Sequence, residues 1–192
     1  MMWPSGSATT AARTACSGRS SPGQPPPGPP KHLGCTAIEL AGADSVIVVE
    51  QRSGVEAGCW GGLLTLGAKV RGVAGVVADG PLRDVDEAIA YEFPVFSRSL
   101  TSRTARGRVV ELGVQVPVTI GAELGGEVSV RPGDYVLADR SAVIFIAEAD
   151  IERVLEAAEM IVAKEAAMAK AILSGTPISA VMGGNYEHML RT

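Results

Sequence analysis

The sequence predicts a single α/β domain that follows a tail without regular structure. From about residue 33, short runs rich in Val and Ile recur between Gly, Pro and Asp residues, which is typical of strands separated by turns. Two of these runs are almost wholly apolar, which indicates a sheet covered on both faces. A long helical pattern follows the last of these runs, at residues 149–175. These three observations together favour an α/β fold with a long C-terminal helix.

The individual elements follow from the same pattern. Six runs are expected to be strands: 45–50, 73–78, 93–98, 116–121, 135–139 and 142–147. Residues 61–72 predict a short helix that begins at two glycines and ends at Gly72. The helix expected at 149–175 has Asp150 as a candidate N-cap and Gly175 near its end. The "GGLLTLG" run lacks the GxGxxG spacing of a dinucleotide site, so a doubly wound nucleotide-binding fold is not expected.

Residues 1–31 differ in texture from the rest of the chain. They are dominated by Ser, Ala, Gly and Pro and show no periodic apolar pattern. Such a segment cannot offset the entropy of ordering, so we expect a disordered tail, or an incorrectly assigned start, before a domain at 32–192.

Composition excludes several classes of function. With 17 Lys and Arg against 21 Asp and Glu, the net charge of -4 gives no general attraction to nucleic acid, and the basic run at 101–108 is the one local exception. No apolar run approaches the roughly 20 residues needed to span a membrane. Three scattered cysteines and two histidines fit neither a disulfide framework nor a zinc site. We therefore expect a soluble, cytoplasmic protein in which any metal is held by oxygen.

The stretch "DGPLRDVDE" at 79–87 places four carboxylates around one arginine. Arg83 and Asp84 follow a buried strand and a Gly-Pro turn, where loops often carry chemistry. Gly61 and Gly62 open a helix, whose unpaired N–H groups and dipole favour an anion. If the strand at 73–78 returns the chain beside that helix start, the carboxylate of a small acid could lie between the amides and Arg83. Asp84 would then be left to hold a cation.

Each of these features also has a purely structural interpretation. An Arg-Asp pair after a turn is commonly a surface ion pair or a helix cap, and a Gly-Gly pair is commonly a tight turn. Glu165 falls on the apolar stripe of the C-terminal helix, but its head could reach water at the edge of that stripe. The arginines at 103, 106 and 108 could form a solvated face or a subunit contact. Local chemistry alone leaves the function undecided.

The combination of spacings is more specific than its parts. The stretch "WGGLLTLGAKVRGVAGVVADGPLRDVDE", followed by "FPVFSR" and "VRPGDYVLAD", resembles the RraA-like family, which includes 4-hydroxy-4-methyl-2-oxoglutarate aldolases. The mark of that family is an acid or glycine, twenty intervening residues, and then Arg-Asp. Gly62, Arg83 and Asp84 fit this spacing. Glu87 matches the glycine-type version, in which an acid follows three residues after the aspartate.

The resemblance implies a layered β/β/α domain of the swivelling type, assembled as a homotrimer or as paired trimers with active sites between subunits. It also implies a divalent cation, commonly Mg²⁺, that stabilises a pyruvate enolate. Position by position, the backbone at Gly61, Gly62, Leu63 and Leu64 would bind the carboxylate of a 2-oxo acid, and Arg83 would bind the substrate. Asp84 would bind the metal. Glu165 is the candidate for the glutamate that supports the metal from a neighbouring subunit.

The resemblance further implies a metal-dependent lyase, and one departure bears on its reaction. Typical aldolases of the family have an aspartate at the position of Gly62, which helps remove the proton from the substrate hydroxyl. Oxaloacetate decarboxylation needs no such base, so we expect it to survive better than aldol cleavage, unless Glu87 supplies the missing base. The alternative is a non-catalytic regulator that binds ribonuclease E, as some family members do.

Overall fold

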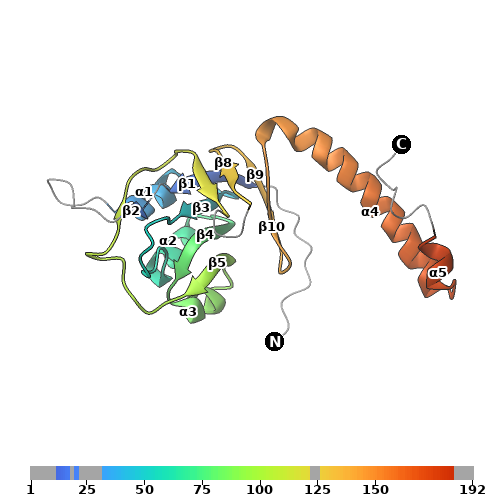
Figure 1. Cartoon of the computed structure of the whole chain (residues 1–192), viewed down its shortest axis with the longest axis horizontal. Helices are drawn as coiled ribbons and strands as arrows, with labels where there is room; N and C mark the ends of the chain where they lie inside the picture. Colours follow the sequence, from blue (N-terminus) through green and yellow to red (C-terminus); the bar gives the residue numbers. More distant parts are fainter. Residues whose placement is uncertain (1–11, 18–19, 22–31, 122–125, 184–192) are drawn as a thin grey trace. The chain divides into compact units, whose positions relative to one another are not determined.

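The computed structural model describes residues 12–17, 20–21, 32–121 and 126–183. The chain divides into two compact units, residues 1–148 and 149–192. Among the described residues, the first unit contains the strands and the helices α1, α2 and α3, and the second contains the helices α4 and α5 (Figure 1).

A six-stranded sheet organises the first unit, with the order β10-β9-β1-β3-β4-β5. Strands β1, β3, β4 and β5 run parallel, whereas β9 is antiparallel to β1 and β10 is antiparallel to β9. These strands span Ala12–Ser17 (β1), Val46–Glu50 (β3), Gly75–Leu82 (β4), Val95–Leu100 (β5), Tyr135–Ala138 (β9) and Val143–Ile146 (β10). The carboxyl ends of β3, β4 and β5 therefore meet at one edge, which is where ligands commonly bind in open α/β sheets.

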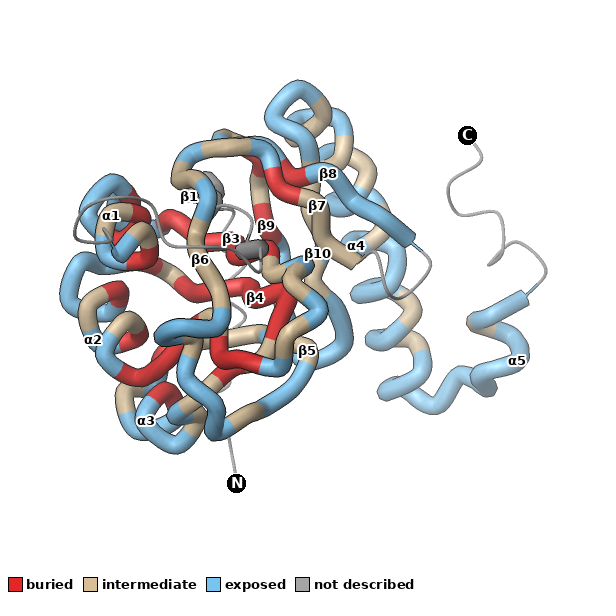
Figure 2. The backbone as a smooth tube through the Cα atoms, turned by 60° about the vertical axis from the view of Figure 1, so that its left-hand side comes forward, coloured by how far each residue is buried: buried red, intermediate tan, exposed pale blue. Residues whose placement is uncertain are grey.

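Each face of this sheet is covered by a different layer. Helices α1 (Leu33–Leu40), α2 (Gly62–Val70) and α3 (Val85–Ala90) contribute to a core that includes Ile47 and Val49 of β3. On the other face, Val46 and Val48 pack in a second core with the hairpin of β7 (Val118–Ile120) and β8 (Val128–Val130). Figure 2 shows the buried strands between these layers. The expected β/β/α layering is confirmed.

Strand β3 shows why the sequence folds in this way. All five of its residues are buried, and alternate side chains enter opposite cores because successive residues of a strand point to opposite faces. The run "VIVV" is thus apolar on both faces because both faces are covered.

The six expected strands are confirmed, and the structure adds elements that the sequence pattern did not indicate. Strand β4 extends beyond the expected 73–78 to Leu82. Helix α3 begins within the acidic motif, and α1 precedes β3. Two short strands, β2 (Ser20–Ser21) and β6 (Val110–Glu111), form a separate pair. Strands β1 and β2 fall within the range expected to be a tail, and β1 lies in the middle of the sheet.

The boundary between the two units falls within a 3-10 turn, η2 (Glu148–Asp150), and the second unit contains α4 (Ile151–Leu173) and α5 (Ile178–Val181). Asp150 occupies the N-cap position of α4, but its side chain makes no capping hydrogen bond and instead accepts one from Arg153. Gly175 adopts a left-handed backbone just past the end of α4. The helix has a predicted apolar stripe, yet none of its residues is buried in the described chain.

Candidate active site at the start of helix α2

The segment that leads into α2 runs beside the end of β4. The amide of Cys59 donates to the carbonyl of Pro81 at 2.9 Å, and the amide of Arg83 donates to the carbonyl of Trp60 at 3.0 Å. Trp60 is buried, and its indole N–H donates to the hydroxyl of Thr65 at 3.0 Å, which fixes the segment to the helix it precedes. The expected return of the chain beside the helix start is therefore present in the structure.

Asp84 joins this turn to the first residue of α2. Its Oδ2 accepts a hydrogen bond from the amide of Gly62 at 3.0 Å and lies 3.8 Å from Nη2 of Arg83. An acid at the N-terminus of a helix is stabilised by the unpaired amides and the dipole. The backbone of Asp84 is left-handed, with φ 59° and ψ 40°, a conformation that Asp tolerates better than most residues. The side chains of Arg83 and Asp84 are about one third exposed, at 35% and 38%.

Glu87 lies over the α-carbon of Gly62. A Cβ atom added at Gly62 would be 1.9 Å from Oε2 of Glu87 and 2.5 Å from its carboxyl carbon. Gly62 does not have a positive φ, so it is the space that it leaves, rather than its backbone freedom, that admits the Glu87 carboxylate. An acid at position 87 thus occupies the place next to the helix start that a side chain at position 62 would take.

Gly58 has a similar relation to Arg83, which sequence reasoning missed. A Cβ atom there would be 2.5 Å from Cγ and 2.9 Å from Cδ of Arg83, so the aliphatic stem of Arg83 lies directly on this glycine. A signal for this was present in the sequence as a glycine three residues before the Gly-Gly pair, but nothing local indicated its partner.

The remaining predicted residues are placed as follows. Leu63 points to solvent, whereas Leu64 packs against the helix-side core. Their backbone N–H groups belong to the first turn of α2, where no intrahelical acceptor exists, and no acceptor is found for them among the described residues. Glu165 is exposed on α4 in the second unit.

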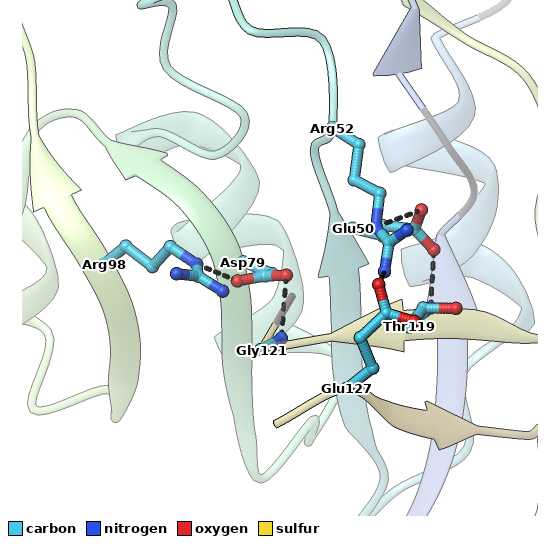
Figure 3. Close-up of polar contacts among 7 residues, drawn as sticks. All are labelled: Glu50, Arg52, Asp79, Arg98, Thr119, Gly121 and Glu127. Carbon is cyan, nitrogen blue, oxygen red and sulfur yellow. Dashed lines mark hydrogen bonds and ion pairs between the residues drawn. The ribbon is translucent and has the colours of Figure 1, made fainter. Parts of the chain in front are cut away.

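A second polar cluster lies at the same edge of the sheet (Figure 3). Glu50, which ends β3, is fully buried. Its Oε2 accepts from the amide of Thr119 at 2.6 Å, and its Oε1 lies 3.4 Å from Nε of Arg52. Arg52 also pairs with Glu127 at 3.2 Å. The Glu50 carboxylate therefore ties strand β7 to the end of β3.

Asp79 forms a matching contact on the neighbouring strand. It is 6% exposed, stands opposite Glu50 in the register of β3 and β4, and forms an ion pair with Arg98 of β5. Its other oxygen accepts from the amide of Gly121 at 3.2 Å. Asp79 thus belongs to this buried cluster, apart from the other acids of its motif. The signal in the sequence was a charged residue at the end of an otherwise apolar strand, seen in both Glu50 and Asp79.

A cavity of about 500 Å³ opens beside this buried cluster. It is lined by Gln51, Arg52, Glu56, Asp79 and Arg98, with Gly54, Val55, Gly80, Pro81 and Ser99. The lining includes none of the residues that the sequence predicted for a site. We therefore place the candidate chemistry at the start of α2, where Gly62, Arg83, Asp84 and Glu87 meet.

Cys59 lies between the two clusters. Its thiol donates to the carbonyl of Pro81 at 3.3 Å, and burial raises its pKa to about 12, with a smaller contribution from the charge of Asp79. A thiol with such a pKa is not a nucleophile at neutral pH. Cys59 is therefore a structural residue in this environment.

The donor set favours at most a weakly chelated metal. Among residues 12–17, 20–21, 32–121 and 126–183, no three His, Cys, Asp or Glu side chains gather into a metal-binding group. Asp84 uses Oδ2 to accept from Gly62, and no hydrogen bond or ion pair engages its Oδ1 within that part of the chain. A single carboxylate that is about one third exposed fits Mg²⁺, which keeps several waters and needs only one or two protein carboxylates.

No helix in the described residues is long and apolar enough to cross a membrane.

Comparison with known proteins then establishes the family. The family model RraA-like, described as Aldolase/RraA, matches residues 5–145. The chain belongs to this family. An uncharacterised protein of Methanocaldococcus jannaschii is 35% identical over 127 residues, which is 66% of this chain and 58% of that protein. A protein of Halalkalibacterium halodurans, provisionally named a 4-hydroxy-4-methyl-2-oxoglutarate aldolase, is 32% identical over 71% of this chain and 62% of its own length. The chain thus spans about three fifths of the length of these two relatives.

Solved structures show the same fold. An uncharacterised protein of Pseudomonas syringae superposes with a TM-score of 0.74 at 24% identity, covering 89% of this chain and 74% of its own. The Streptomyces coelicolor protein RraAS2, described as an unusual member of the RNase ES inhibitor RraA family, superposes with a TM-score of 0.66 at 21% identity, covering 78% and 71%. At these identities the likeness concerns the fold.

Proposed function

We propose that this RraA-like chain is a divalent-metal-dependent lyase that cleaves 2-oxo acids through a pyruvate enolate. Its reactions would be oxaloacetate decarboxylation, 4-hydroxy-4-methyl-2-oxoglutarate aldol cleavage, or both. The observation that carries the proposal is the contact between Asp84 and the amide of Gly62, which brings Arg83, an acid and a helix start into one site. The provisional aldolase name of relatives at 31–32% identity supports the same reaction class.

The chain supplies two groups for the substrate carboxylate. The amides of Leu63 and Leu64 are the unpaired donors of the first turn of α2, and an anion is favoured there. The guanidinium of Arg83 can bind a carboxylate in bidentate fashion, and its stem is fixed against Gly58. Substrate would therefore be held at one end by fixed donors, which orient the bond to be broken.

Asp84 would hold the divalent cation through its oxygen Oδ1. The cation, for which Mg²⁺ is the simplest choice, would act as a Lewis acid toward charge on the 2-oxo oxygen of the substrate. We further propose that the active unit is a homotrimer, or a pair of trimers, with its sites between subunits. In that assembly Glu165 of a neighbouring copy would support the metal site.

The two reactions make different demands on the protein. In oxaloacetate, the bond between C3 and C4 breaks, CO₂ leaves, and the electron pair passes to the enolate of pyruvate, which then takes a proton from water at C3. In aldol cleavage, a base must first remove the proton from the C4 hydroxyl; the bond between C3 and C4 then breaks, the C4 fragment leaves as pyruvate, and the electron pair passes to the enolate of a second pyruvate. Glu87 lies where an acid at position 62 would stand, so its carboxylate is the candidate base. Glu87 is thus needed for the second reaction alone.

The test is the release of pyruvate from oxaloacetate, with Mg²⁺ and with chelator, by the intact chain and by Asp84→Asn. Asn tolerates the left-handed backbone of position 84 as Asp does, so the variant removes charge with little strain. We expect at least about a hundredfold loss of metal-dependent release, because the loss of the metal carboxylate removes several kcal/mol of transition-state stabilisation. Asp86→Asn is the matched control, since Asp86 is an exposed acid two residues away. Pyruvate release by the folded chain that does not exceed the uncatalysed background, from oxaloacetate and also from 4-hydroxy-4-methyl-2-oxoglutarate, would rule out the lyase.

The second candidate function is that of a ribonuclease-binding regulator. A structure of the RNA-processing inhibitor RraA from Thermus thermophilis is 25% identical, with a TM-score of 0.55 over 71% of this chain and 75% of its own. Gly62, in place of an acid, is compatible with such a role. Tight binding to ribonuclease E without turnover of any 2-oxo acid would favour this function over the lyase.

A further inference from the structure

The basic run at 101–108 is held beside the candidate site. It connects β5 to β6, and its path is fixed where the amide of Gly58 donates to the carbonyl of Arg103 at 2.9 Å and where Gly58 bridges Thr104. Gly58 is also the residue on which the stem of Arg83 lies. One glycine therefore separates the basic loop, defined as residues 101–108, from the arginine proposed to bind substrate.

The basic loop is an ordered turn. The amide of Arg103 donates to the hydroxyl of Thr101 at 3.2 Å, and the amide of Arg106 donates to the hydroxyl of Thr104 at 3.3 Å. Nη1 of Arg108 donates to the carbonyl of Thr104 at 3.0 Å. These bonds anchor the backbone of the loop near Gly58 and reduce the entropy lost when its side chains bind a ligand.

The three arginines of the basic loop differ in how they are paired. Arg103 forms an ion pair with Glu56 at 3.2 Å, so its charge is already balanced. Arg106 and Arg108 are exposed, and neither has a carboxylate partner within the part of the chain that the structure describes. The basic loop therefore carries two positive charges that no carboxylate of the described residues balances, on a backbone that bonds to Gly58, the residue under the stem of Arg83.

The net charge of the site indicates a role for these two arginines. Asp84, Asp86 and Glu87 outnumber Arg83, so the turn is negative by two charges, which one divalent cation would neutralise. A 2-oxo acid with a second carboxylate brings two further negative charges. One of these can be met by the donors at the helix start, but the second carboxylate needs positive charge supplied from elsewhere.

We infer that Arg106 and Arg108 bind the second carboxylate of a dianionic 2-oxo acid and make the site selective for dicarboxylates over monocarboxylates. The inference rests on the proposed lyase function and deepens it by assigning two specificity-determining residues. Guanidinium groups suit this role because they bind carboxylates in bidentate fashion and remain charged at all working pH values.

The chemistry predicts a particular kinetic pattern. In oxaloacetate the second carboxylate is the group that departs as CO₂, and its negative charge moves away during the reaction. A contact to that carboxylate stabilises the bound substrate at least as well as the transition state. Loss of the contact should therefore raise KM and leave kcat unchanged or higher.

The experiment compares the intact chain with the double variant Arg106→Gln/Arg108→Gln in Mg²⁺. We expect KM for oxaloacetate to rise about tenfold, which is the effect of one lost charge-assisted contact at an exposed site, while kcat does not fall. Arg71→Gln is the matched control, because it removes an exposed arginine at the opposite end of α2 and should leave KM unchanged. Circular dichroism and thermal melting establish that each variant is folded.

A binding measurement separates this inference from the lyase proposal. Calorimetry with Mg²⁺ present gives the affinities for 2-oxoglutarate, a dianion, and 2-oxobutyrate, a monoanion of similar chemistry. We expect the intact chain to prefer the dianion and the double variant to lose most of that preference. An intact chain that decarboxylates oxaloacetate but shows the same preference as the double variant overturns the inference and leaves the lyase standing. A preference lost in the double variant, with no turnover by the intact chain, supports the dianion site and overturns the lyase.

Discussion

The edge of the sheet carries two acid-arginine clusters that differ in how far their bonding capacity is used. In the buried cluster, Asp79 pairs with Arg98 and also accepts a backbone amide. In the open cluster, Asp84 lies 3.8 Å from Arg83, and both side chains are about one third exposed. The same two residue types thus form a structural tie in one place and a candidate binding site in the other.

The difference shows how burial decides the role of an ion pair. A buried charge is tolerated only when hydrogen bonds and a partner replace its water, so Asp79 and Glu50 have little capacity left for a ligand. Asp84 and Arg83 keep access to solvent, and a substrate or cation can replace that solvent without breaking the fold. Chemistry is therefore expected at the open cluster and stability at the buried one.

The largest effect should come from breaking the buried cluster. Asp79→Ala would leave Arg98 without its carboxylate and the amide of Gly121 without an acceptor, and we expect the free energy of unfolding to fall by about 3 kcal/mol. Asp86→Ala, at an exposed acid of the open motif, should change it by about 0.5 kcal/mol or less. Urea denaturation of both variants measures this contrast. Equal stabilities would contradict the division between the two clusters.

The open cluster could be predicted from the sequence because a short, regular stretch of chain joins its residues. The spacing from Gly62 to Arg83 spans one helix and one parallel strand, so its ends return to the same edge of the sheet by the ordinary geometry of such a unit. The apolar run of β3 likewise indicated a doubly covered sheet, and the structure confirms it.

The buried cluster could not be predicted in the same way. The contact of Asp79 with Arg98 depends on the register of β4 against β5, which shifts between Ala78 and Pro81. The bond from Thr119 to Glu50 joins residues 69 positions apart. No periodicity in the sequence encodes either pairing. Gly58 was missed for the same reason, because its importance lies in a side chain from another segment.

The second-largest effect tests whether Glu87 of the open cluster acts in only one of the two reactions. Glu87→Gln should lower the rate of aldol cleavage of 4-hydroxy-4-methyl-2-oxoglutarate by about a hundredfold, which is the usual contribution of a general base. Oxaloacetate decarboxylation should change by about threefold or less, because it needs no base. Parallel assays of the two substrates measure the ratio of the rates. A uniform loss of both activities would indicate that Glu87 supports the fold of the site rather than removing a proton.

The smallest effect tests whether the thiol of Cys59 is shielded from water in the folded protein. Its pKa is raised from 9.0 to about 12 by burial, so the folded protein keeps the thiol neutral while the unfolded chain ionises above pH 9. The contribution of this pKa difference to the free energy of unfolding is fully present below pH 9 and is lost as the pH rises toward 12. Between pH 8 and pH 10 the intact chain should therefore lose about 1 kcal/mol more stability than Cys59→Ser, whose hydroxyl keeps the bond to Pro81 but does not titrate. Urea denaturation at both pH values measures the difference. Parallel losses in the two proteins would mean that water reaches the thiol of Cys59 in the folded protein.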